Sequence, residues 1–226
     1  MVIRVSMVPR PSDPVVSRLG RLCERAVVSL PAAGAGLSVV ARDNQFGLLA
    51  AADEASERLE ELQLVLGEGP CIDAAAARRP VLIADLAQVG PTRWPMYADA
   101  VRDAGIGAIF AFPLQVGAAQ LGVLDLFRAQ PGPLSAAELS HAFGLADEAV
   151  SILLDGQERA GDELSSGESM AGPVELFQAQ GMVMIQIGGT LAEAMARIRA
   201  HAYAENRRLV DVARDVIARS LRFDQD

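Results

Sequence analysis

The sequence lacks the features of a membrane-spanning or secreted protein. No stretch reaches the roughly 18 consecutive apolar residues that a membrane-spanning helix requires. Cys23 and Cys71 are the only cysteines, too few for a disulfide framework, which is typical of a reducing compartment. Charged residues and prolines interrupt the first twenty positions, where a secretory signal has an apolar run: Arg4, Pro9, Arg10, Pro11 and Asp13. We therefore expect a cytoplasmic protein.

Basic charge is also scarce, and lysine is absent altogether. The 226 residues include 29 acidic and 20 basic side chains, all of the latter arginine, so the formal net charge is −9. This balance argues against a protein that is basic over its whole surface. From residue 173 onward, however, seven arginines balance seven acids, and the acidic excess lies before that point. Clustered arginines there could still bind phosphate.

Hydrophobic residues make up 51% of the chain, enough to fill the core of one or two domains. Helices are expected at 14–30, 54–66, 71–79, 94–104 and 135–155. Strands are expected at 35–42, 46–52, 81–84, 108–116 and 120–128. This order predicts an α+β domain with an antiparallel sheet and flanking helices. Residues 1–13 are expected to be disordered, and the Gly-, Ser- and acid-rich segment 156–172 to be a flexible linker.

Three helices are expected in the last fifth of the chain. The first covers residues 174–187 and ends at Gly188, because glycine is unfavourable inside a helix and suits its left-handed end. Thr190 and Glu193 then form a capping box that starts the second helix. Apolar stripes at helical spacing mark the second and third helices: Leu191, Ala194, Met195, Ile198 and Ala202, then Leu209, Val212, Ala213, Val216 and Ser220. The pattern predicts an all-α three-helix bundle.

The same segment resembles the ANTAR family, the RNA-binding domain of transcription antitermination proteins. The resemblance rests on AQG at 179–181, LAEAMARIRAHA at 191–202 and RRLVDVARDVIAR at 207–219, in order and without gaps. It implies binding to a nascent transcript whose paired hairpins prevent a terminator from forming. Hairpin loops are the expected target, because an A-form duplex hides its base edges in a deep groove.

The resemblance places an RNA-binding surface beside the apolar stripe of the second helix and at the turn that follows. Small alanines let a backbone approach, arginine can pair bidentately with phosphate or guanine, and tyrosine can stack on an unpaired base. We expect these side chains to point outward together as one patch: Arg199, Tyr203, Arg207, Arg208, Arg214 and Arg219. The alternative is that the arginines are ordinary solvated helix residues and that Tyr203 packs at an edge.

Residues 14–155 resemble a GAF sensor domain, and most of all the GAF domains that are fused to ANTAR domains. The resemblance rests on LQLVLGEGPC at 62–71, RPV at 79–81, RWP at 93–95, FPL at 112–114 and LGVLDL at 121–126. It implies a domain that senses a small molecule or mediates dimerisation. The lysine-bearing signature of cyclic-nucleotide GAF domains is excluded, because the chain has no lysine.

Cys71, Phe112 and Asp125 are the candidates for a ligand pocket in this domain. Asp125 alternates with apolar positions of its strand, and a carboxylate there could orient a ligand or cap a loop. Cys71 could lie at a helix N-terminus, where the dipole lowers a thiol pKa and suits a redox sensor or nucleophile. It could equally be a small buried apolar residue. No cofactor or metal is predicted, since His141 on an amphipathic helix is typical of packing or surface.

The sequence thus predicts a two-domain regulator in which the GAF domain (14–155) passes its state through a linker (156–172) to the ANTAR bundle (173–223). The apolar circumference of the first bundle helix favours a homodimer. Two other interpretations stay open. The bundle could contact a protein instead of RNA, or the GAF domain could be a cysteine-dependent methionine-sulfoxide reductase. We predict no enzyme, because the resolving thiol such chemistry wants has only Cys23 as candidate, on a separate helix.

Overall fold

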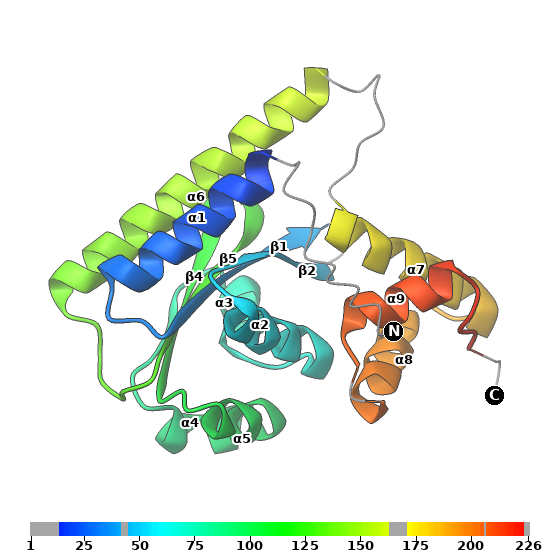
Figure 1. Cartoon of the computed structure of the whole chain (residues 1–226), viewed down its shortest axis with the longest axis horizontal. Helices are drawn as coiled ribbons and strands as arrows, with labels where there is room; N and C mark the ends of the chain where they lie inside the picture. The colour runs from blue at the N-terminus through cyan, green and yellow to red at the C-terminus, as the bar shows by residue number, and fades with distance from the viewer. Residues whose placement is uncertain (1–13, 42–44, 163–170, 206, 224–226) are drawn as a thin grey trace, which may run out of the picture.

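One antiparallel sheet of five strands forms the centre of the part of the chain that the structure describes (Figure 1). This computed structural model describes residues 14–41, 45–162, 171–205 and 207–223. The strands stand in the order β2-β1-β5-β4-β3. Their bounds are β1 Gly34–Ala41, β2 Gln45–Ala51, β3 Val81–Ile83, β4 Ala108–Val116 and β5 Ala119–Arg128. The expected antiparallel α+β architecture is therefore confirmed.

Alternation along β5 separates the two faces of the sheet. Successive side chains of a strand point to opposite sides. Leu124 and Leu126 accordingly belong to one core, whereas Val123 and Phe127 belong to the other. Asp125 lies between Val123 and Phe127 in this alternation and is fully buried on their side.

Two long helices, α1 (Pro14–Ser29) and α6 (Ala136–Asp162), cover the Leu124 side of the sheet (Figure 1). The expected capping box begins α6. Ser135 Oγ accepts a hydrogen bond from the Glu138 amide at 3.2 Å, and the Glu138 carboxylate accepts one from the Ser135 amide at 2.6 Å. The helix ends at Asp162 rather than near residue 155, so its last turns occupy sequence that we assigned to the linker. Segments 1–13 and 163–170 lie outside the described residues.

The opposite face is covered by shorter helices. These are α2 Glu54–Leu66, α3 Pro70–Ala77, α4 Leu86–Arg93 and α5 Pro95–Asp103. Helix α4 was not expected from the sequence, because Gly90 and Pro91 break its pattern. Asp85 nevertheless caps it, accepting hydrogen bonds from two backbone amides of its first turn.

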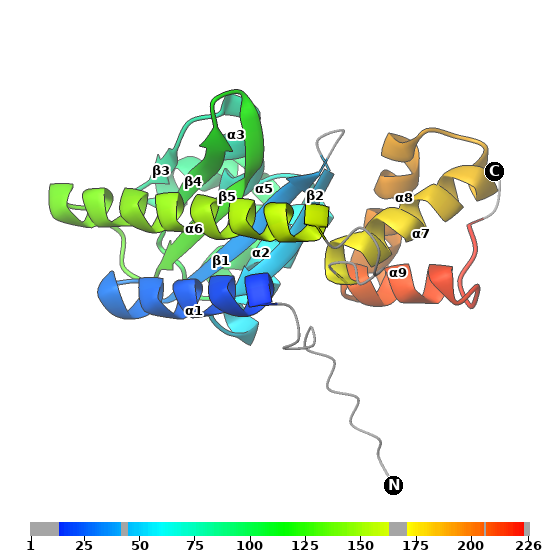
Figure 2. The same cartoon turned by 90° about the horizontal axis from the view of Figure 1, so that it is seen from above.

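The last three helices form a bundle beside β2 and α2 (Figure 2). They are α7 Ala171–Ile187, α8 Leu191–Ala204 and α9 Leu209–Ile217. The Thr190–Glu193 capping box is present, and Ala194, Ile198 and Ala202 are buried as expected. Leu191 and Ser220, the end members of the two stripes, are exposed. Among the described residues, no helix combines the length and hydropathy that crossing a bilayer requires.

Candidate functional site

Helix α8 presents an exposed arc opposite its buried stripe. Ala192, Ala196 and Ala200 are exposed along it, and Tyr203 follows with 60% of its surface accessible. These are the small and aromatic residues expected at a nucleic-acid surface. This accessible fraction leaves much of the Tyr203 side chain open to solvent.

Arg199 does not join this exposed arc. It is half-buried and lies against the C-terminal end of α2, where its Nη1 would be 2.9 Å from a Cβ added to Gly67. Its Nε has no hydrogen-bond partner among the described residues, and burial lowers the pKa of its guanidinium. The structure therefore directs Arg199 toward the N-terminal domain.

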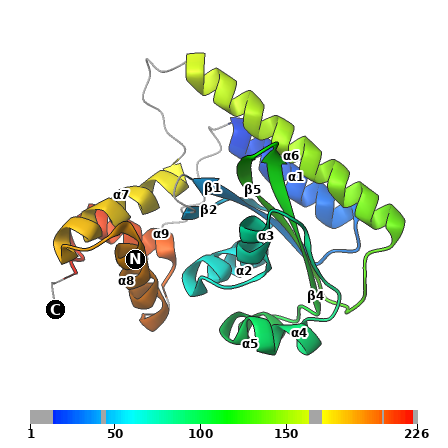
Figure 3. The same cartoon turned by 180° about the vertical axis from the view of Figure 1, so that it is seen from behind.

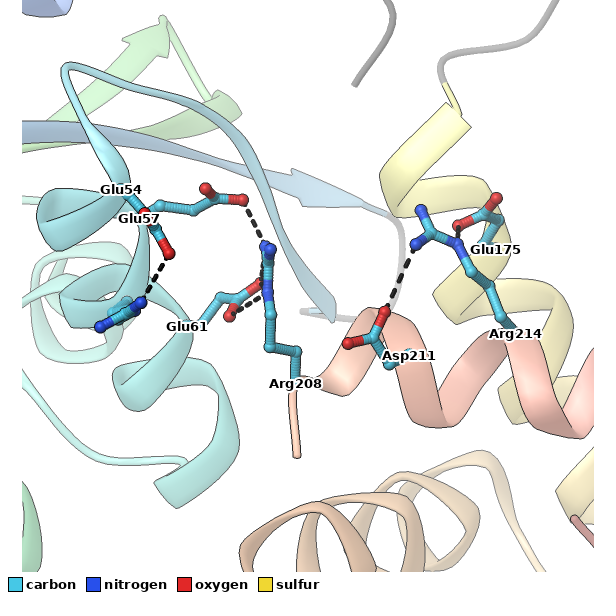
Figure 4. A network of polar contacts seen from close by, with 8 residues as sticks. Glu54, Glu57, Glu61, Glu175, Arg208, Asp211 and Arg214 are labelled. Carbon is cyan, nitrogen blue, oxygen red and sulfur yellow. Dashed lines mark hydrogen bonds and ion pairs between the residues drawn. The ribbon is translucent and has the colours of Figure 1, made fainter. Parts of the chain in front are cut away.

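Arg208, which precedes α9, is held by two carboxylates of α2 (Figure 4). Its Nε donates to both oxygens of Glu61 at 3.0 Å, and its Nη2 donates to Glu61 Oε1 at 2.6 Å and to Glu57. The side chains of Arg208, Glu57 and Glu61 are 39%, 22% and 12% exposed. We call this contact between the two domains the α2 clasp. Figure 3 shows α2 between the sheet and α8.

Charge and burial oppose each other in the α2 clasp. Hydrogen bonds and charge from Glu61, with a further contribution from Glu57, raise the pKa of Arg208 despite its partial burial. Burial also raises the pKa of Glu61, and the neighbouring Arg208 only partly offsets this. Loss of one partner would leave the other charge partly buried and without its counter-charge, although solvent reaches Arg208 and screens the pair.

Two more of the expected RNA-binding arginines are paired within the bundle. Arg207 Nη2 lies 2.7 Å from Asp215. Arg214 Nε lies 3.0 Å from Glu175 on α7, as Figure 4 shows. Arg219 is exposed and follows the C-cap residue of α9, with a left-handed backbone at φ 61°. The expectation of six side chains pointing outward as one patch is therefore wrong for this conformation. Sequence periodicity could not show it, because two of the carboxylates come from α2, far away in the chain.

A second polar cluster lies inside the N-terminal domain. It contains Ser38 of β1, Glu60 and Gln63 of α2, Cys71 of α3 and Asp125 of β5, all buried. Gln63 Nε2 donates to Asp125 Oδ2 at 2.6 Å, while Gln63 Oε1 accepts from the Cys71 amide at 2.8 Å. Ser38 Oγ donates to Glu60 Oε2 at 2.9 Å. These bonds tie α2, α3 and two central strands together.

Cys71 occupies the first turn of α3, as expected, but its thiol is not activated there. It is fully buried, and burial, reinforced by the charges of Asp125 and Glu60, raises its pKa well above the usual value. Cys23 is buried in the core on the other side of the sheet. The N-terminal dipole is thus outweighed, and a pairing of the two thiols in a reductase cycle has no geometric support.

The structure does not bring Phe112 to Cys71 and Asp125. Ala111 pairs with Asp125 across β4 and β5, so Phe112, one residue on, points to the other face. There it meets Phe143 of α6 edge to face, with ring centroids 5.3 Å apart. Sequence reasoning missed Glu60, Gln63 and Ser38. No local signal marked them, because polar residues are ordinary in an amphipathic helix and a serine is ordinary in a strand.

Comparisons with known proteins match both parts of the chain. The model of the GAF domain matches residues 16–154, and that of the ANTAR domain matches residues 169–217. No curated protein matches. A GAF domain from a Coxiella burnetii phosphoenolpyruvate-protein phosphotransferase is similar at 18% identity and TM-score 0.53, covering 65% of this chain and 86% of its own. A GAF domain from a Bacillus halodurans two-component sensor histidine kinase is similar at 11% identity and TM-score 0.50, covering 64% and 95%. At such identities these likenesses show the fold alone.

Proposed function

Because the chain belongs to the GAF domain family and carries an ANTAR domain after it, we propose that it binds hairpin RNA in nascent transcripts and promotes antitermination. Its two domains make the chain a regulator with a sensory GAF domain and an RNA-binding ANTAR output. We propose antitermination and the hairpin target in addition to this role, and we propose that the protein acts in the cytoplasm.

The exposed arc of α8 is the observation that supports RNA binding best. Tyr203 offers an accessible ring, and three exposed alanines beside it leave room for a sugar-phosphate backbone. Unpaired bases of a hairpin loop stack on such rings, whereas paired bases do not. The arc is accessible although the neighbouring arginines are paired, so loop recognition can begin on it before any ion pair opens.

The α2 clasp supports control of this output by the GAF domain. Phosphate and the carboxylates of α2 compete for the same guanidinium, that of Arg208. A signal that moves α2 therefore changes the availability of Arg208 to RNA. The conformation described here is the closed one, in which the GAF domain holds Arg208.

Tyr203→Ala is expected to weaken binding of a two-hairpin RNA by about five- to hundredfold, because stacking of one base contributes about 1–3 kcal/mol. Filter binding at several salt concentrations measures the change. Tyr203→Phe keeps the ring and should retain most of the affinity. If wild-type protein binds scrambled RNA as tightly as two-hairpin RNA at every salt concentration, the proposed hairpin recognition is wrong.

We also propose a homodimer. Ile185 of α7 is 75% exposed, although other apolar residues of this helix pack on α8, α9 and β2. Helix α7 is apolar over most of its circumference, and contiguous apolar surface that the bundle leaves uncovered favours a partner. Light scattering at micromolar concentration should give twice the chain mass, and Ile185→Glu should lower it. A monomeric wild-type protein would contradict the proposal.

A further inference from the structure

We propose that Glu60, Cys71 and Asp125 form a binding site for a divalent cation of the zinc class. One ligand atom from each of the three residues lies within 4.8 Å of the other two. All three side chains are fully buried, and they come from α2, α3 and β5. The site is thus assembled by the tertiary fold and is distinct from the RNA surface.

Each carboxylate keeps one oxygen free for a ligand. Glu60 uses Oε2 to accept from Ser38, and Asp125 uses Oδ2 to accept from Gln63. Glu60 Oε1 and Asp125 Oδ1 receive no hydrogen bond from any N–H or hydroxyl group of the described residues. The two carboxyl groups can hydrogen-bond to each other, but only while one of them holds a proton. Because two buried carboxylates cannot both stay charged side by side, a proton or a cation is required between them.

Tyr97 of α5 provides an independent indication. Its side chain is fully buried, and its hydroxyl also has no partner in the described part of the chain. Tyr97 belongs to the same core as Cys71. A buried, unpartnered hydroxyl from a fourth element therefore lies in the core that holds the cluster.

The donor set selects the kind of cation. Magnesium and calcium take oxygen ligands, whereas zinc accepts both thiolate and carboxylate. Zinc lies about 2.3 Å from sulfur and about 2.0–2.2 Å from carboxylate oxygen, so binding requires only a small contraction of the cluster. The Ser38 and Gln63 hydrogen bonds would orient the carboxylates, as outer groups do around metal ligands.

Two glycines leave the space that this cluster occupies. A Cβ on Gly36 would lie 2.3 Å from Glu60 Cγ, and a Cβ on Gly69 would lie 2.4 Å from Gln63 Oε1.

Without a cation, protons must compensate the buried charges. A cation would displace these protons together with that of the Cys71 thiol.

Cobalt(II) is the probe of choice, since a thiolate ligand gives it a near-ultraviolet charge-transfer band. Full-length protein is treated with chelator and reductant, passed into chelator-free buffer and titrated with cobalt, then with zinc. We expect one equivalent of cobalt to produce the band and zinc to remove it. Cys71→Ser should abolish the band, whereas Cys23→Ser, which removes the buried cysteine on the other side of the sheet, should retain it. Ser38→Ala should weaken binding about 10–100-fold.

Thermal unfolding separates a missing site from a misfolded variant. Zinc should raise the midpoint of wild type and of Cys23→Ser, because a ligand that binds only the folded state stabilises it. It should leave the midpoint of a folded Cys71→Ser protein unchanged. The proposal is overturned if folded wild type gives no band, or if Cys71→Ser keeps it; a shared proton then satisfies the two carboxyls. Neither readout involves RNA, so such a failure leaves the proposed function untouched.

Discussion

Replacing Glu57 and Glu61 by glutamine is expected to increase the affinity of the full-length protein for two-hairpin RNA by about tenfold. The substitutions keep the size of both side chains but remove the charges that hold Arg208. Arg208 then becomes available to phosphate. Filter binding at fixed salt concentration measures the change, since affinity for RNA depends steeply on salt.

The size of this effect follows from the exposure of the clasp. Arg208 is 39% exposed, so each ion pair contributes less than a fully buried one, and solvent screens it. Two such pairs amount to about 1.4 kcal/mol, which is a factor of ten in the equilibrium between closed and open forms. Apparent affinity rises in proportion to the open fraction as long as the closed form predominates.

A matched variant controls for the loss of negative charge. Glu54→Gln with Asp103→Asn also removes two acids, but Glu54 pairs with Arg58 and both positions are exposed. This pair should change RNA affinity far less than the clasp variant. Arg208→Ala opens the clasp too, yet it should weaken RNA binding, because it removes the contact that opening provides. If the clasp variant and its control bind RNA equally, α2 does not restrain the output.

The fold could be predicted from the sequence where each segment carries its own signal. The bounds of α2 and β4 are as expected, and both capping boxes form, because caps and apolar periodicity are local properties. Helix α4 was missed, because its glycine and proline hide a helix that Asp85 caps. The length of α6 was underestimated for the same kind of reason, since polar residues near its end resemble a linker.

The sites could be predicted only in part, because they depend on contacts between distant segments. The leucine periodicity of α2 indicates one side that faces inward, and Leu59 is buried there. It does not indicate that Glu60 lies in the core or that Glu61 holds Arg208. Each position could be predicted only if its contact partner were known. Glu60 lies against the strand residue Gly36, and Glu61 binds Arg208, which is 147 positions further along the chain.

Gly36→Ala is expected to destabilise the folded protein by about 3 kcal/mol. Alanine normally suits a strand better than glycine does, so the expected loss of stability comes from the steric clash alone. The added Cβ would lie 2.3 Å from Glu60 Cγ and 2.6 Å from Glu60 Oε1. Glu60 has no room to withdraw, because its side chain is fully buried and hydrogen-bonded to Ser38. Gly36 also pairs with Asp125 in the sheet, so the strand itself is held in place.

Urea denaturation measures this loss, with Trp94 as the reporter. It is the only tryptophan in the sequence, and it is 2% exposed in the core on the Glu60 side of the sheet. Gly144→Ala is the control, because Gly144 lies in α6 with nothing within 4 Å of an added Cβ. There alanine should stabilise the protein by about 0.5–1 kcal/mol, as in any open helix position.

A double-mutant cycle with Glu60→Ala tests the cause. Removing the Glu60 side chain leaves the new methyl group of Gly36→Ala with space, so the second substitution should cost little in that background. The coupling free energy should then be about 2–3 kcal/mol, at the upper end of what neighbouring residues show. An equal cost of Gly36→Ala in both backgrounds would mean that Glu60 does not lie against β1. In that case the buried cluster would have a different geometry, and the steric contact between Gly36 and Glu60 could not be the cause of the loss in stability.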